Sequence, residues 1–119
     1  MSQNFQPGDI LIFQIESGYG LLRVLAIDER PGNTVWHLSA YENLFLDVDM
    51  ADAALDAGDS LKISHPHLAL TNRAFESTQV ARMRNVPLTD ADLAALKLWS
   101  LDEKREVSDR SVRLLLGLR

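Results

Sequence analysis

The sequence changes its dominant periodicity at Pro87. Before this residue, short runs of β-branched and apolar residues alternate with turns that contain Gly, Pro or Asn, which is the pattern of β-strands. After it, strong helix formers dominate. Strands followed by helices are typical of an α+β domain, in which helices cover an antiparallel sheet. Because 119 residues is the size of one domain, we predict a single domain over 1–119, strand-rich over 9–85 and helical over 89–119.

The first part of the chain predicts a three-stranded antiparallel meander. Its strands are expected at 10–16, 21–27 and 34–41, with turns at Ser17-Gly18-Tyr19-Gly20 and Pro31-Gly32-Asn33. Side chains alternate between the two faces of a strand, so every second apolar residue belongs to one face. The core residues predicted in this way are Leu11, Phe13, Ile15, Trp36, Leu38 and Ala40.

The middle of the chain predicts one short helix and further strands. The helix is expected over 50–57 with Asp49 as its N-cap, and the strands at 61–64, 67–75 and 78–85. The last two strands are predicted to form a hairpin around Glu76-Ser77.

Two helices are predicted at the C-terminal end. Thr89 and Asp92 have the spacing of a capping box before a helix over 91–101. Ser108 with Asp109 begins a second helix that runs through Leu116. The expected architecture is a strongly bent antiparallel sheet, or a partly open SH3-like barrel, with C-terminal helices packed against it.

Composition narrows the classes of function. The sequence contains no cysteine, which excludes a disulfide framework, a thiolate zinc site and a cysteine nucleophile and fits a cytoplasmic location. No apolar run approaches the length of a signal peptide or a membrane span, so we expect neither. The net charge of −5 disfavours nucleic-acid binding by overall electrostatics. The charge is uneven, because residues 1–60 hold two Lys/Arg and ten Asp/Glu, whereas residues 61–119 hold ten and seven.

The three histidines are the candidate metal ligands. His65 and His67 are two residues apart, a spacing that places both imidazoles on one face of a strand, and His37 could supply a third ligand. Three neutral imidazoles can hold zinc with one open position. Pro66 between the pair removes a backbone donor and favours a strand edge or a turn. The simpler interpretation is three surface histidines and no cofactor, with a small metal-dependent enzyme as an alternative.

Three arginines form a candidate binding surface. Arg82 and Arg84 are two apart on a predicted strand, so both are expected on one face, and Arg73 is expected nearby across the hairpin. Guanidinium groups gathered on one face could bind phosphates or a partner's carboxylates. The simpler interpretation is a solvated face whose arginines pair with acidic neighbours.

The predicted C-terminal helices carry more apolar surface than one packing face needs. The apolar residues of 112–118 span an arc of about 200°, against roughly 100° for a surface helix. In the helix over 91–101, Leu98, Trp99 and Leu101 share one broad face, and the remaining leucines lie on the other. Large exposed apolar patches usually mark interfaces. We therefore predict a homodimer, or a groove for a partner, with Leu93, Leu96, Leu114 and Leu118 as its contacts.

About 20 N-terminal residues carry a family pattern. It consists of a strand start at Pro7-Gly8-Asp9-Ile10, a turn at Ser17-Gly18-Tyr19-Gly20 and a strand at Arg23-Val24-Leu25. This pattern resembles the opening of a bacterial immunity-protein family from polymorphic toxin systems. It is also similar to SH3-like barrels in general, including the RNA-polymerase-interacting domain of the CarD type. The resemblance implies a small bacterial protein that binds and blocks a toxin, and it assigns no site residues.

The sequence as a whole favours a non-catalytic, cytoplasmic protein-binding domain. It contains no nucleophile elbow, phosphate-binding loop or dinucleotide fingerprint, so we do not expect an enzyme. The most specific version of this prediction is an immunity or antitoxin-like protein that neutralises a toxin. The alternative is a nucleic-acid or RNA-polymerase-associated module that uses the arginine face. The expected partner is another protein or a second copy of this chain, and not a membrane.

Overall fold

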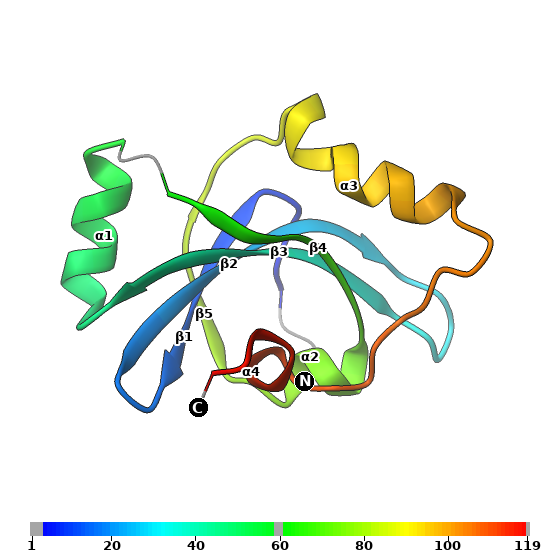
Figure 1. Ribbon diagram of the computed structural model, residues 1–119, viewed down its shortest axis with the longest axis horizontal. Helices are drawn as coiled ribbons and strands as arrows, with labels where there is room; N and C mark the ends of the chain where they lie inside the picture. The colour runs from blue at the N-terminus through cyan, green and yellow to red at the C-terminus, as the bar shows by residue number, and fades with distance from the viewer. Residues whose placement is uncertain (1–3, 59–60, 119) are drawn as a thin grey trace.

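The computed structural model describes residues 4–58 and 61–118 and has an α+β architecture (Figure 1). Its antiparallel sheet has five strands, in the order β4-β3-β2-β1-β5. The strands are β1 (Asp9–Ile15), β2 (Gly18–Asp28), β3 (Val35–Phe45), β4 (Ile63–Thr71) and β5 (Val80–Asn85). Within the described residues β4 and β5 do not pair, so the sheet is not closed. The predicted fold class and antiparallel sheet are confirmed.

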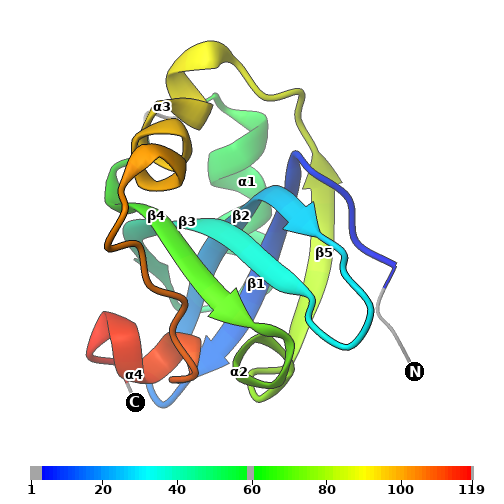
Figure 2. The same cartoon turned by 90° about the vertical axis from the view of Figure 1, so that its right-hand side faces the viewer.

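Four helices cover the two faces of the sheet (Figures 1 and 2). They are α1 (Val48–Asp56), α2 (Asn72–Glu76), α3 (Asp90–Leu101) and α4 (Val112–Leu116). The short helices α2 and α4 lie on the face that we call the first face, and α1 and α3 lie on the opposite, second face. None of the helices in the described ranges is long and apolar enough to cross a membrane.

The first face carries the main apolar core. The six core residues predicted from strand alternation are all buried in it: Leu11, Phe13, Ile15, Trp36, Leu38 and Ala40. Phe75 of α2 and Val112 of α4 complete this core, and both are fully buried. The β-branched and aromatic residues of these strands therefore pack as their period of two predicts.

The second face differs between its two halves. Under α1 it is apolar, with Ile10, Ile12 and Leu21 packed around Ala51. Towards α3 it carries buried polar groups, including Arg23, His37 and Ser39. In contrast to α1, α3 has no fully buried residue. The helix α3 therefore rests on a polar part of the sheet, and side-chain contacts rather than an apolar core position it.

Arg23 connects the sheet to the start of α3. Its guanidinium donates to the backbone carbonyls of Val86 and Pro87, at 2.7 and 3.0 Å, and pairs with Asp92 at 3.2 Å. Asp92 also accepts hydrogen bonds from Thr89 in the predicted capping box, which is confirmed. These hydrogen bonds and the nearby guanidinium lower the pKa of Asp92.

The structure corrects the hairpin predicted around Glu76-Ser77 between the last two strands. β4 and β5 lie at opposite edges of the sheet, and the segment between them folds as α2. Thr71 begins this helix, because its side chain accepts a hydrogen bond from the backbone of Ala74. Local β-propensity over 67–75 did not reveal this cap.

Two helix starts also differ from prediction. Asp47, rather than Asp49, caps α1 by accepting from the backbone of Met50. α4 begins at Val112 with Ser111 as its N-cap, instead of at Ser108. Ser108 is extended and pairs with the edge of β4, where its backbone bonds to Ala69 and Thr71. A sheet edge that offers unpaired donors and acceptors thus competes with the local helix signal.

Candidate functional site

The predicted arginine pair is divided between the two faces of the sheet. A β-bulge lies between Arg82 and Arg84, because these residues oppose Leu11 and Ile10, which are adjacent on β1. Arg82 binds the buried carboxylate of Asp9 at 2.9 Å. Arg84 reaches α1, where its guanidinium pairs with Asp52 and Asp56 at 2.6 and 3.0 Å. The expectation that both side chains share one face is therefore wrong.

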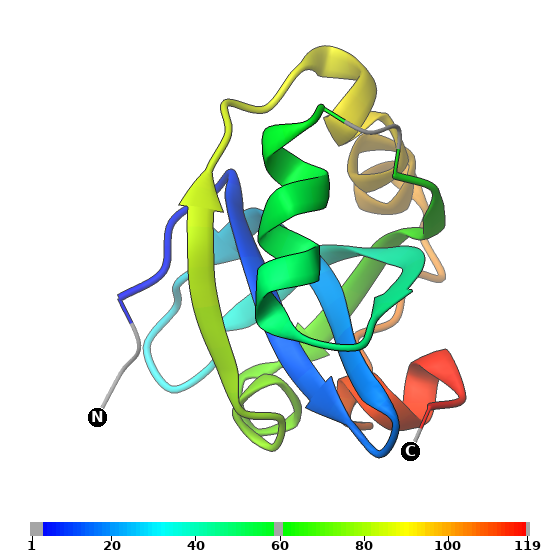
Figure 3. The ribbon, with the colours of Figure 1, turned by 90° about the vertical axis from the view of Figure 1, so that its left-hand side faces the viewer.

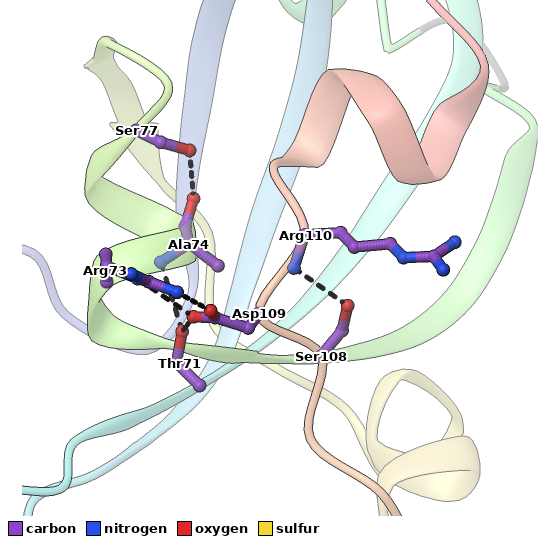
Figure 4. A network of polar contacts seen from close by, with 7 residues as sticks. All are labelled: Thr71, Arg73, Ala74, Ser77, Ser108, Asp109 and Arg110. Carbon is purple, nitrogen blue, oxygen red and sulfur yellow. Dashed lines mark hydrogen bonds and ion pairs between the residues drawn. The ribbon is translucent and has the colours of Figure 1, made fainter.

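Arg73 lies apart from these two arginines, on α2. It forms an ion pair with Asp109, which also accepts a hydrogen bond from Thr71 (Figure 4). Each of the three predicted arginines thus has an acidic partner, and they do not form one cationic cluster. This arrangement matches the simpler interpretation of paired surface charges.

The three histidines are also separated by a bulge. β4 has an extra residue at Pro66, so His65 opposes Ala40 of the first face, whereas His67 lies on the second face beside His37. Among the described residues, no group of three or more His, Cys, Asp or Glu side chains could hold a metal ion. The structure therefore assembles two of the three predicted histidines.

His37 and His67 form a compact cluster with Trp99 of α3. His37 Nδ1 lies 2.9 Å from His67 Nε2, so one imidazole donates a hydrogen bond to the other, and the rings are stacked with centroids 5.2 Å apart. The indole of Trp99 covers both rings, with centroids 5.0 Å from His37 and 5.2 Å from His67. Trp99 is half-buried and packs on these two imidazoles.

Burial keeps both imidazoles in the neutral form. Desolvation lowers the pKa of His67 to about 4, and the neighbouring His37 adds to this effect. Desolvation also lowers the pKa of His37, against the attraction of Asp28. At neutral pH the cluster is therefore an uncharged hydrogen-bonding pair beneath an aromatic ring.

A cavity of about 520 Å³ adjoins this cluster, and we call it the β4-edge recess. It lies between β4, α3, α4 and the segment 106–110. Its lining includes His67, Trp99, Glu106, Ser108, Arg110 and Leu115. The recess has the size of a small-molecule site and combines apolar walls with a few polar groups.

The leucines predicted as interface contacts differ in exposure. Leu114 is 63% exposed, whereas Leu93, Leu96 and Leu118 are half-buried. The most exposed apolar side chains of α3 are Leu98 and Leu101, which the helical pattern had placed with Trp99 on one face. Because α3 turns Trp99 towards the histidines, these two leucines point away from the sheet.

Sequence reasoning missed one group of exposed apolar side chains. It runs from the end of β3 into the first turn of α1, a stretch predicted only as a strand end and a helix start (Figure 3). We define the 42–50 surface by its exposed apolar residues Leu44, Leu46, Val48 and Met50 and its exposed acidic residues Glu42, Asp47 and Asp49. The sequence did indicate that this region is acidic. No Lys or Arg lies between Arg30 and Lys62, and every Asp or Glu in that segment adds negative charge.

Comparison of the chain with models of protein families, with curated proteins and with solved structures found no match.

Proposed function

We propose that this chain is a non-catalytic protein-binding domain that uses the 42–50 surface to bind a basic partner. The observation that carries the proposal is the exposure of four large apolar side chains within seven consecutive residues, 44–50. Exposed apolar groups that are contiguous on a small domain usually mark an interaction site. The carboxylates of Glu42, Asp47 and Asp49 would attract a partner whose apolar contacts are surrounded by Lys or Arg.

The charges near this surface support the choice of partner. Asp52 and Asp56 farther along α1 are already paired with Arg84, so they add little to the local potential. The basic residue Lys62 lies beside the surface, because its backbone carbonyl accepts a hydrogen bond from the Glu42 amide. The surface therefore keeps a net negative charge around its apolar residues, and a basic partner would associate faster at low ionic strength.

The proposed architecture is a partly open SH3-like barrel. Its support is a bent five-stranded sheet in which the first strand pairs with both the second and the last. The short α2 joins the two edge strands, β4 and β5, and contributes Phe75 to the core of the first face. The most specific form of the proposed function is a cytoplasmic immunity or antitoxin-like protein. A toxin gene beside this gene would support that form, and a neighbourhood without one would argue against it.

A model peptide tests the 42–50 surface. The probe is a helical peptide with one Lys-rich face and one Leu-rich face. In an NMR titration it is expected to shift the backbone amide signals of residues 42–50, because it supplies both complementary charge and apolar contact. Raising the salt from 50 mM to 500 mM should weaken the binding. Replacing Leu46, which is 75% exposed, by Ser should weaken it about tenfold, the effect of losing one buried leucine.

The matched control is Val86→Ser, because Val86 is also an exposed apolar residue but lies outside both the 42–50 surface and the C-terminal helices. It should leave the affinity unchanged. Equal weakening by the two substitutions, or amide shifts centred on α3, would contradict the proposal. A peptide in which Glu replaces every Lys is expected not to bind.

Self-association is a second form of protein binding that we propose, through the exposed leucines of the C-terminal helices. Leu98, Leu101 and Leu114 are at least 63% exposed. Light scattering after size exclusion is expected to give a dimer mass at high concentration, and Leu114→Lys with Leu98→Lys should return the chain to a monomer. A monomer at every concentration would contradict this.

A further inference from the structure

One wall of the β4-edge recess is the indole of Trp99, whose orientation is fixed by contacts within the chain. Trp99 Nε1 donates to the backbone carbonyl of Glu106 at 3.0 Å. The guanidinium of Arg105 lies 5.9 Å from the ring centroid and lines a separate cavity on Trp99. Together with the histidine contacts, these interactions fix the orientation of the ring. A fixed aromatic wall binds a flat apolar ligand at a low entropic cost.

Among the described residues that line the recess, Arg110 is the cation. Arg110 is exposed, and its guanidinium has no ion-pair or hydrogen-bond partner among residues 4–58 and 61–118. Only its backbone bonds, to the Ser108 hydroxyl, while the neighbouring Asp109 is committed to Arg73. Figure 4 shows the Arg110 side chain extending away from that network. The guanidinium is therefore free to bind an anion in its planar, two-pronged geometry.

The remaining lining groups limit the charge of the ligand. His67 already shares its Nε2 with His37, which leaves its Nδ1 for another contact, and burial keeps the ring neutral near pH 7. Glu106 also borders the recess. Because the recess is lined by one arginine and one glutamate, it favours a monoanion over a doubly charged phosphate. Leu115 and Trp99 provide the apolar contacts.

We propose that the β4-edge recess binds a small aromatic carboxylate, with its ring against Trp99 and its carboxylate on Arg110. This site is separate from the 42–50 surface, so the proposed ligand binding does not depend on the proposed binding of a basic protein partner. The recess, at about 520 Å³, accommodates one or two fused rings.

Titration with naphthalene-2-carboxylate, followed by NMR of the two indole N–H groups, tests the proposal. The Trp99 signal is expected to shift, whereas the Trp36 signal, whose N–H donates to Asn72, should stay unchanged and serve as an internal reference. Arg110→Gln should raise the Kd about tenfold, as the loss of one charge-assisted contact predicts. The neutral analogue naphthalene-2-carboxamide should bind the unmodified chain about tenfold more weakly than the acid.

Arg113→Gln is the matched control, because Arg113 is exposed on α4 and does not line the recess. It should leave the Kd unchanged. Equal binding of acid and amide would overturn the proposal by showing that only apolar contact matters. The proposal would also be overturned if the Arg110→Gln variant kept its affinity or if the Trp99 signal did not shift. Complete competition by equimolar inorganic phosphate would overturn it as well.

Discussion

Replacing Phe75 by Ala is expected to lower the free energy of unfolding by about 3–5 kcal/mol. Phe75 is fully buried, and its ring stacks on Trp36 with centroids 3.9 Å apart and an angle of 11° between the planes. Phe5 packs edge-on against both rings. Because α2 has five residues, it is too short to be stable by itself, and Phe75 is its main anchor in the core.

Thermal unfolding and urea titration measure this effect. A domain of this size has a stability of about 5–15 kcal/mol, so the substitution removes a large part of it and should lower the Tm by about 10 °C or more. The control is Phe75→Leu, which keeps most of the volume and should cost less than half as much. If Phe75→Ala cost less than about 1 kcal/mol, the docking of α2 on Trp36 would be wrong.

The second large effect is a loss of stability in mild acid. The pKa of His67 is lowered from 6.5 to about 4 in the folded chain. Between these two values the unfolded chain binds a proton that the folded chain does not, so stability decreases as the pH falls from 6.5 to 4. The full difference corresponds to about 3 kcal/mol, and partial exposure of the imidazole reduces it to about 2 kcal/mol. The lowered pKa of His37 acts in the same direction.

Urea denaturation at pH 7 and pH 4.5 measures this loss, and NMR of the imidazole protons gives the pKa of His67 directly. His67→Gln keeps a hydrogen-bonding group without the titration, so its stability should change less between the two pH values. His65→Gln is the matched control, because His65 lies on the first face and its replacement leaves the contact between His37 and His67 in place. An imidazole of His67 that titrates near 6.5 would contradict the buried histidine pair.

The same histidines show where sequence reasoning stops. Two side chains at positions i and i+2 share a face only if the strand pairs without interruption. A bulge in β4 separates His65 from His67, and a bulge in β5 separates Arg82 from Arg84. A bulge depends on how a strand pairs with its neighbour, which is a property of two distant segments. The contact of His37 with His67, 30 residues away, is likewise a consequence of the pairing of β3 with β4.

The sequence by itself determined the features that depend on local chemistry. These are the α+β order, the core residues of β1 and β3, and the capping box of α3. Periodicity and capping depend on a few neighbouring residues, so they can be recognised without knowing which distant segments pack against them. The tertiary structure alone decided that β4 and β5 are opposite edges, that Trp99 covers two histidines, and that Leu44, Leu46, Val48 and Met50 are exposed. Each of these depends on which surfaces meet after the sheet has formed, and packing between distant segments overrides local propensity.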